Sequence, residues 1–241
     1  DTMSKYTNLL NEQIKESLES YIIEQNLQPG DTLPSERKLA ELLNANRLTV
    51  RTALKRLRNE HLIYTKQGKG TFIAPPKIIE GTSKLESFSS GWEKDGYIPT
   101  SKILEISEIE ASLSICYRLQ LNLGEKVFSL NRLRFLNNEP IALEHAYIPS
   151  KLVPGILKYN FETESLYSIL ESAYKLRLTR QEETISICHM RKNEARNLNK
   201  KEGDPAFFIK GISFNDDIPF EYCITINPAD RYVLSSKMKP E

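Results

Sequence analysis

The stretch NANRLTVRTALKRL, residues 44–57, places two kinds of side chain at the residue spacing of a helix. An apolar stripe recurs at steps of four and three, at Val50, Leu54 and Leu57. A basic stripe runs beside it at steps of four, four and three, at Arg47, Arg51, Lys55 and Arg58. At about 100° per residue, the basic stripe spans roughly 80° of a helix surface. The pattern predicts a helix that packs along one side and presents cations along the neighbouring side.

The residues around this helix predict a small domain with a defined order of elements. Apolar side chains at i+4 spacing predict a first helix over residues 7–26. Ser35 can cap a second helix over 36–44, and Asn46 can cap the third, which reaches about residue 60. Two β-branched and aromatic runs flank KQGKG, which predicts a hairpin with a glycine-rich tip. Three helices and a hairpin describe a winged helix-turn-helix.

In such a domain the third helix lies in the major groove of DNA, with its first residues nearest the base edges. Arg47 and Arg51 can present paired donors to guanine O6 and N7 or to phosphate. Asn46 and Thr49 offer shorter hydrogen bonds from the same end of the helix. A winged helix can also be a protein-interaction module, but the adjacent stripes and the capped start favour DNA.

Charge is distributed unevenly along the chain. Residues 35–74 hold nine Lys or Arg against three Glu, a net of +6, whereas the whole chain carries +1, so the remainder is net −5. A basic segment on a mildly acidic body indicates a polyanionic partner for that segment. At the hairpin tip, Gly68 lets the backbone approach DNA closely, and Lys69 can reach a phosphate.

Several classes of protein are excluded. The three cysteines form no CxxC pair, which argues against a disulfide framework or a metal site. No apolar run approaches the ~18 residues of a membrane span, and no signal peptide is recognisable, so we expect a cytoplasmic protein without a membrane partner. His61, His145 and His189 show no metal spacing and no Ser or Cys partner in sequence. We therefore expect no metal, no cofactor and no catalytic residue.

The pattern changes after residues 75–83, which are rich in proline and read as a linker between domains at 4–74 and 84–241. Alternating segments predict strands at 101–109, 126–136, 139–148, 178–190, 205–214 and 218–227. Helical patterns lie near 84–95, 112–121, 164–175 and 193–200. Hairpin turns are expected at Asn137-Asn138 and at the NDD of residues 215–217. The second domain is therefore expected to be an α+β unit around a largely antiparallel sheet.

Two arginines in this domain suggest an anion site. Arg132 and Arg134 are two residues apart on a predicted strand, so both side chains leave the same face. Buried arginines need a negative partner, which a phosphate or carboxylate ligand or an internal acid would supply equally well. A two-residue turn at Asn137-Asn138 would place Glu144 on the opposite face from Arg132. The two can then meet one ligand only if a bulge or a longer turn intervenes.

The segment at residues 33–73 resembles the DNA-binding domain of GntR-type bacterial transcription regulators through its LPSER, TVR-x-AL and G-x-GTF blocks. In that family the matching residues that contact DNA fall on Arg37, Asn46, Arg47, Arg51 and Gly68. Asn46 replaces the usual serine or threonine, and NAN replaces the common Gly-Val-Ser turn. The resemblance therefore implies DNA binding, and at residues 44–46 this chain is expected to differ from the family in the bases that it prefers.

RLRFLNNEPIALEHAYIP (132–149), SLYSIL (165–170) and IPFEYCITINPADRY (218–232) are similar to the UTRA effector domain of the HutC subfamily, which shares the fold of chorismate lyase. In members that respond to phosphosugars, the matching arginines and serine bind phosphate, and two acids address sugar hydroxyls. The implied effector site comprises Phe88, Ser89, Arg132, Arg134, Glu144, Ser165, Glu221 and Asn227. Asn227-Pro228 stands where sugar-phosphate members often carry Tyr-Arg, so the sugar-recognising half is altered.

Together these observations predict a bacterial transcription regulator that represses sugar uptake or catabolism genes. It is expected to bind a palindromic operator in double-stranded DNA as a homodimer and to respond to a phosphorylated sugar or amino sugar. One alternative keeps the DNA role with a carboxylate catabolite or a lipid as effector. Another is an enzyme with a lyase-like catalytic domain, which no nucleophile–base pair or metal constellation in the sequence supports.

Overall fold

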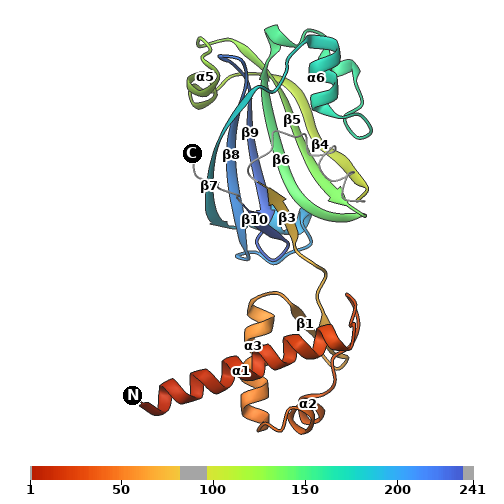
Figure 1. The fold of residues 1–241 in the computed structure, drawn as a ribbon. Coiled ribbons are helices and arrows are strands. Elements are labelled where there is room, and N and C mark those ends of the chain that lie inside the picture. The colour runs from red at the N-terminus through yellow and green to blue at the C-terminus, as the bar shows by residue number, and fades with distance from the viewer. Residues whose placement is uncertain (1, 82–96, 236–241) are drawn as a thin grey trace. The chain divides into compact units, whose positions relative to one another are not determined.

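The computed structural model of the chain describes residues 2–81 and 97–235 (Figure 1). The chain divides into two compact units, Asp1–Lys77 (unit 1) and Ile78–Glu241 (unit 2). The predicted helix at 84–95 lies outside the described residues.

Unit 1 has the predicted order of a winged helix-turn-helix. Its elements are α1 (Thr2–Glu24), α2 (Glu36–Leu42), α3 (Arg47–Asn59), β1 (Ile63–Lys66) and β2 (Gly70–Ile73). Both predicted caps are confirmed: Ser35 Oγ accepts from the Lys38 N–H at 3.3 Å, and Asn46 Oδ1 accepts from the Thr49 N–H at 2.9 Å. Each cap satisfies an amide that has no partner inside its helix. The caps define where the two helices of the DNA-binding motif begin.

The apolar stripe of α3 forms the centre of the core of unit 1. Val50, Leu54 and Leu57 are buried and pack with Leu18 of α1 and Leu39 of α2. Leu42 lies at the end of α2, and half of its surface is exposed. Burial of one side of α3 leaves its basic stripe to face away from the core.

The wing is a short antiparallel hairpin in which Lys66 pairs with Gly70. The rings of Tyr64 and Phe72 stack across the two strands, with centroids 5.5 Å apart. Gly68 at the tip has φ +70°, a left-handed conformation that glycine adopts without strain. The predicted glycine-rich tip is confirmed.

Unit 2 is built around a six-stranded sheet in the order β4-β5-β6-β9-β8-β7, in which every neighbouring pair is antiparallel (Figure 1). Its strands are β4 (Pro99–Glu110), β5 (Lys126–Leu136), β6 (Glu139–Pro149), β7 (Arg180–His189), β8 (Pro205–Asn215) and β9 (Ile218–Pro228). The helices are α5 (Leu113–Leu119), α6 (Leu166–Tyr174) and α7 (Lys192–Asn197), with 3-10 turns η1 (Ser150–Leu152) and η2 (Ile156–Lys158). The predicted α+β class and antiparallel sheet are confirmed.

Helices cover both faces of the sheet. On one face, Leu166 and Leu170 of α6 pack on Phe128 and Leu130 of β5. On the other face, α5 packs on Val127 and its neighbours in β9. Arg132 and Arg134 lie on the α6 face, because they continue the alternation of Phe128 and Leu130 along β5.

A bulge resolves the register of the β5–β6 hairpin. Asn137 and Asn138 form the expected two-residue turn, with φ +49° and +66°. The pairing then shifts between Arg134 and Phe135, so that one extra residue, Ile141, is inserted in β6. This shift places Arg132 directly opposite Glu144. The bulge that the sequence required for these side chains to share a face is therefore present.

The predicted linker at 75–83 is partly a strand. Ile78–Gly81 form β3, which pairs in parallel with β10 (Tyr232–Ser235). Ile78 is fully buried against Ile141 and Tyr232. Ile78 thus has apolar partners that are distant in sequence, which the local composition did not reveal.

Candidate DNA interface and anion site

The basic stripe of α3 lies on the surface of unit 1. Arg47, Lys55 and Arg58 are exposed, and no carboxylate in the described part of unit 1 pairs with any of them. Arg37, in α2, is also exposed and lies 3.9 Å from Glu41. These cations are held on capped helices with their charged ends in water, as a polyanion-binding surface requires.

Arg51 differs from the rest of the stripe because it already has a partner. Its Nε and Nη2 donate to Glu36 Oε2 at 3.0 and 2.9 Å. The guanidinium remains 59% exposed, so the pair is screened by water and contributes little to stability. Its consequence is geometric: a carboxylate on α2 sets the orientation of an arginine on α3.

The cap at the start of α3 changes the predicted role of Thr49. This residue is buried and donates its hydroxyl to Asn46 Oδ1 at 3.2 Å, rather than facing outward as a base contact. It lies next to Val50 on the packed side of the helix. Asn46 itself is exposed, and only its side-chain oxygen takes part in these two bonds, so its amide N–H groups are not used in the cap. At the wing, Lys69 is exposed and nothing lies within 4 Å of a Cβ built on Gly68.

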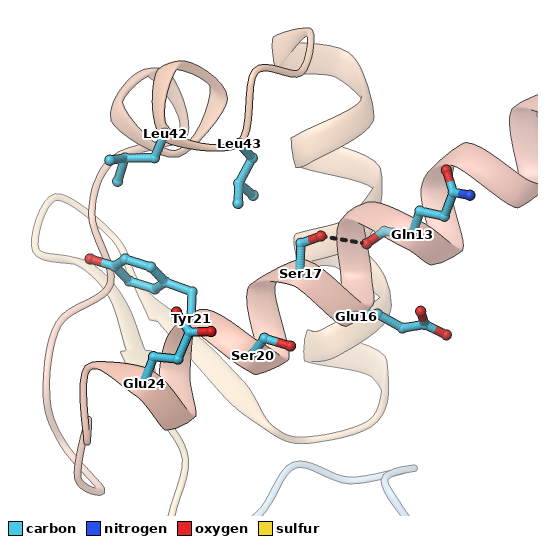
Figure 2. Close-up of a pocket in the computed structure, with 8 residues that line it drawn as sticks. All are labelled: Gln13, Glu16, Ser17, Ser20, Tyr21, Glu24, Leu42 and Leu43. Carbon is cyan, nitrogen blue, oxygen red and sulfur yellow. Dashed lines mark hydrogen bonds between the residues drawn. The ribbon is translucent and has the colours of Figure 1, made fainter.

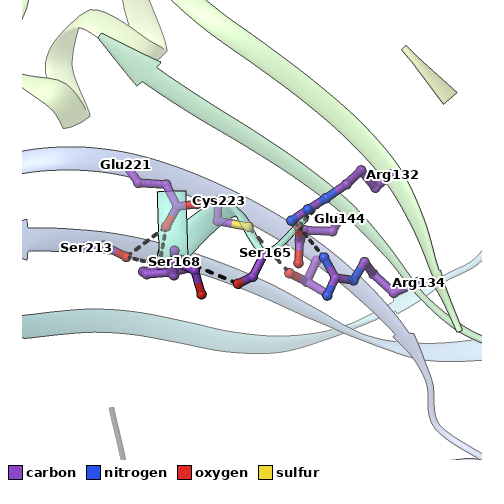
Figure 3. Close-up of polar contacts among 10 residues, drawn as sticks. Arg132, Arg134, Glu144, Ser165, Ser168, Ser213, Glu221 and Cys223 are labelled. Carbon is purple, nitrogen blue, oxygen red and sulfur yellow. Dashed lines mark hydrogen bonds and ion pairs between the residues drawn. The ribbon is translucent and has the colours of Figure 1, made fainter. Parts of the chain in front are cut away.

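In unit 2, one carboxylate lies between two arginines (Figure 3). The side chains of Arg132 and Arg134 are 4% and 5% exposed. Arg132 Nε donates to Glu144 Oε1 at 3.0 Å, and its Nη2 contacts the same oxygen. Arg134 Nη1 lies 3.7 Å from that oxygen. Of the two possibilities that the sequence left open, the ligand-free chain therefore shows an internal acid facing both arginines.

The groups in this cluster stay charged. Burial acts to raise the pKa of Glu144, but the charges of Arg132 and Arg134 hold this pKa below its usual value. Burial lowers the pKa of Arg134 to about 10, which still leaves it protonated at neutral pH. A carboxylate and the guanidinium of Arg134 therefore keep their charges in a nearly dry site.

Glu221 lies on the same face of the sheet in a different environment. Ser213 Oγ donates to Glu221 Oε2 at 3.0 Å (Figure 3). The Tyr167 hydroxyl contacts the same oxygen. Burial is the main cause that raises the pKa of Glu221 to about 7. The charge of Glu144 also acts to raise this pKa, whereas the hydrogen bonds from Tyr167 and Ser213 and the charge of Arg132 act to lower it. These influences place Glu144, Glu221 and Arg132 in one electrostatic neighbourhood.

Tyr167 and Ser213 are functional candidates that the sequence reasoning missed. Tyr167 was expected to be a core residue, and its ring does pack edge-on against Phe220 at 6.3 Å between centroids. Its hydroxyl, however, is 2.9 Å from Ser213 Oγ and reaches Glu221. The SLY block held the available signal, since Tyr167 follows Ser165 by two residues.

The other predicted effector residues are less closely assembled. Ser165 caps α6 through its Oγ, which accepts from the Ser168 N–H at 3.5 Å. Asn227 is buried, and its Oδ1 has no hydrogen-bond partner among the described residues. Neither is joined to the arginines by a hydrogen bond in the described part of unit 2. Phe88 and Ser89 lie outside the described residues.

His145 has the serine partner that the sequence did not reveal. Its Nε2 lies 2.8 Å from Ser129 Oγ, and its Nδ1 lies 3.1 Å from the Tyr147 hydroxyl. Burial lowers the pKa of His145, so the ring is neutral at pH 7. Because Ser129 is itself buried and both ring nitrogens are engaged, the array is typical of packing rather than catalysis. Among the described residues, no group of three or more His, Cys, Asp or Glu side chains could hold a metal.

A surface pocket of about 550 Å³ lies in unit 1, between α1 and α2 (Figure 2). Its lining includes Glu16, Ser20, Glu24 and Leu42, all of which are exposed. The lining contains no buried charge, unlike the arginine cluster of unit 2, so the chemistry for anion binding lies at the cluster and not at this pocket. Within the described residues, no helix combines the length and apolarity needed to cross a membrane.

Comparisons with known proteins agree with this geometry. Residues 10–73 match the family described as bacterial regulatory proteins, gntR family, and residues 94–233 match the UTRA domain. The HTH-type transcriptional repressor NagR of Bacillus subtilis (strain 168) is 30% identical over 221 residues, covering 91% of this chain and 90% of that protein. The histidine utilization repressor of Pseudomonas putida is 25% identical over 209 residues, covering 87% and 84%. The crystal structure of PhnF from Mycobacterium smegmatis shares the fold, with a TM-score of 0.69 at 24% identity, covering 95% of this chain and all of that one.

Proposed function

The chain belongs to the GntR family of bacterial regulatory proteins, HutC subfamily, and from this premise we propose that it represses sugar uptake or catabolism genes until a phosphorylated sugar or amino sugar binds its UTRA domain. Relatives that span most of the chain are transcriptional repressors. DNA binding and an effector-binding domain follow from the family. The effector class, the homodimer, the cytoplasmic location and the residues that act are the proposal.

The DNA half of the proposal rests on the exposed stripe of α3. A homodimer places two such helices in successive major grooves of a palindromic operator, about one helical turn apart. Arg47 and Arg51 then contact base edges or phosphates near the start of α3, while Arg37, Asn46, Gly68 and Lys69 contact the flanking backbone or bases. Only one side of α3 packs in the core, which leaves these side chains available.

The effector half rests on a single observation, the two buried guanidiniums of Arg132 and Arg134 that face one side of the sheet beside Glu144. An anionic group can accept charge-assisted hydrogen bonds from guanidiniums in such a site. Ser165, Glu221 and Asn227 surround the remaining parts of the ligand, together with Phe88 and Ser89. Release from DNA requires that the ligand bind the DNA-incompetent arrangement more tightly than the competent one, since equal affinity shifts no population.

Two variants test the two halves separately. The measurement is the affinity for DNA from upstream of the chain's own gene, with and without a panel of sugar phosphates, alongside ligand-induced thermal stabilisation. Arg51→Ala is expected to abolish operator binding and to keep the thermal response, and Arg134→Ala is expected to do the reverse. Lys158→Ala, an exposed change in unit 2, serves as the control. An unchanged effector response in Arg134→Ala would contradict the pocket assignment.

A carboxylate effector is a second candidate, because two arginines can also clamp a carboxylate. Sugar acids therefore belong in the same panel as the sugar phosphates. An enzymatic role finds no support in the relatives, which are regulators by name. Incubation of the purified chain with each ligand that stabilises it, followed by a search for products, would detect any turnover.

A further inference from the structure

The sheet of unit 2 ends in two edge strands of different character, β4 and β7 (Figure 1). β4 begins with Pro99, which has no N–H, and its pairing with β5 is shifted by a bulge between Ile103 and Glu105. Proline and bulges both protect an edge against pairing with a further strand. β7 contains neither, and every residue from Arg180 to His189 pairs with β8 in one unbroken register. Of the two edges, β7 is therefore the one that can accept another strand.

The middle of β7 is apolar and exposed. Residues 184–188, with the sequence TISIC, carry no charge. The side chains of Ile185 and Ile187 are 39% and 73% exposed, and they alternate onto the same face of the sheet. Among the described strands, only β8 pairs with β7. An edge of this kind is a template for strand addition.

The backbone of β7 is oriented for such an addition. Met190 N–H donates to Asp204 O at 2.9 Å, and His189 stands opposite Pro205, which has no N–H to return. In an antiparallel pair, bonded and non-bonded residues alternate. The even-numbered residues of β7 therefore bond to β8, while residues 183, 185, 187 and 189 direct their N–H and C=O groups away from the sheet.

We propose that β7 pairs with β7 of a second copy of this chain, antiparallel, about a two-fold axis at Ser186. The inference rests on the homodimer proposed above and names its interface, which continues the six-stranded sheet from one copy into the other. Pairing of like edges about a two-fold axis closes after two copies. Pairing of β7 with β4 of another copy would leave a free edge at each end and produce an open chain of molecules.

The side chains of β7 favour this position of the axis. Cross-strand partners share a face, so odd-numbered residues must meet odd-numbered ones. With the axis at Ser186, Ile185 lies opposite Ile187 of the second copy, and Glu183 lies opposite its His189. Apolar side chains then meet each other, and a carboxylate meets an imidazole that can donate to it. An axis at Ile185 instead sets Glu183 against Ile187, and an axis at Ile187 sets Ile185 against His189.

A disulfide tests both the interface and its register. On the axis, Ser186 faces its own counterpart in a non-hydrogen-bonded pair with Cα atoms about 4.5 Å apart, a separation that a disulfide spans. Full-length Ser186→Cys, in a Cys188→Ser background, is expected to form a covalent dimer with oxidised glutathione on non-reducing electrophoresis. Thr184→Cys in the same background is the matched control. It lies opposite position 188 and about 13 Å from its own counterpart, so we expect no covalent dimer.

A second variant measures the strength of the interface without new thiols. Ile187→Lys changes an exposed side chain, so the chain is expected to fold, and it places a charge against Ile185 twice in each dimer. The dissociation constant of the dimer, from sedimentation equilibrium, is expected to rise by about tenfold or more. Leu113→Lys, on α5, alters a side chain that is 72% exposed and is expected to keep the wild-type constant.

The outcomes separate the interface from the homodimer on which it rests. If wild type is dimeric, Ser186→Cys crosslinks no better than its Cys188→Ser parent and Ile187→Lys keeps the wild-type constant, β7 is not the interface while the homodimer stands. Equal crosslinking of Thr184→Cys and Ser186→Cys would overturn the axis at Ser186. A wild type that sediments as a monomer at every concentration would overturn the homodimer and this interface together.

Discussion

The two units use the same side chain in opposite ways. In unit 1, Arg47, Arg51 and Arg58 of α3 extend into water, and Arg47 meets no acid in the described part of that unit. In unit 2, Arg132 and Arg134 are almost fully buried and face one carboxylate. The difference arises from backbone geometry. Side chains that recur every three or four residues share one side of a helix, and that side can stay exposed. Both faces of the six-stranded sheet, in contrast, are covered by helices.

The contrast has functional consequences. Exposed cations cost little to maintain and become strong contacts only when many phosphates arrive and release their counterions. Buried cations require a counter-charge at all times, because an unpaired buried charge is costly. A cationic surface on a helix can therefore remain open, whereas the buried arginines of unit 2 keep a carboxylate, Glu144, beside them.

The largest expected effect concerns stability. Arg132→Ala leaves Glu144 buried with only the more distant Arg134, so we expect a loss of roughly 3–5 kcal/mol in the free energy of unfolding of unit 2. Arg47→Ala is expected to change the stability of unit 1 by less than about 0.5 kcal/mol. Urea unfolding of both variants and of the wild type, followed by circular dichroism, measures the two values. Equal losses in the two variants would break the comparison.

The next effect distinguishes the two buried acids by pH. The pKa of Glu221 is raised by burial from its usual 4.5 to about 7, so the folded chain binds this proton more tightly than the unfolded chain. Its contribution is fully present below about pH 4.5 and is lost as the pH rises through about 7. Linkage sets an upper value of about 3 kcal/mol. Glu144, whose pKa is lowered, contributes in the opposite sense and loses its contribution as the pH falls below 4.5.

Thermal melts of wild type and Glu221→Gln between pH 4.5 and 8 measure this effect. The wild type is expected to lose stability relative to Glu221→Gln across that range, because an amide does not ionise. Parallel melting curves for the two proteins would show that Glu221 is ionised in the folded chain at all these pH values.

The same contrast decides what the sequence could predict. The helices of unit 1, their caps at Ser35 and Asn46 and the exposed basic stripe follow from local spacing, and all were predicted. In unit 2 the strands were also predicted, since alternation is local. The partner of Arg132 was not, because it depends on one inserted residue, Ile141, which shifts the register of a hairpin. Sequence spacing showed that a bulge was needed but gave no position for it.

Other misses have the same origin. Ile78 was assigned to a linker because its strand partner, β10, lies about 150 residues later. The ring of Tyr167 does pack in the core, but the partners of its hydroxyl, Ser213 and Glu221, come from other strands and were not foreseen. Thr49 was assigned to DNA because it stands at the start of α3, although its hydroxyl closes the cap. Each of these cases depends on a contact that is not visible in the local sequence.

A smaller effect is expected at an arginine without an internal partner. Arg47→Ala removes a contact to a base or phosphate and is expected to weaken operator binding by about 1–3 kcal/mol per half-site. The loss should shrink at high salt if the contact is to phosphate, because each phosphate contact adds about one unit to the salt slope of the affinity. Fluorescence anisotropy titrations at several salt concentrations distinguish a base contact from a phosphate contact. An affinity equal to that of wild type at every salt concentration would remove Arg47 from the interface.

The smallest effect sharpens the comparison at Arg51, which belongs to the exposed basic stripe and yet is paired with an acid. Glu36 orients its guanidinium, and the same carboxylate adds a negative charge close to where DNA phosphates would lie. Glu36→Gln removes that charge and the forked contact together. Non-specific DNA affinity is therefore expected to rise while affinity for the operator does not, each change amounting to about 1 kcal/mol or less. The ratio of operator to random-sequence affinity is the quantity to measure, with Glu41→Gln as the control on the same helix. A ratio that stays at the wild-type value in Glu36→Gln would mean that Arg51 needs no internal partner to contact DNA. It would then behave like the rest of its stripe, and the basic stripe of α3 would be open to DNA along its whole length.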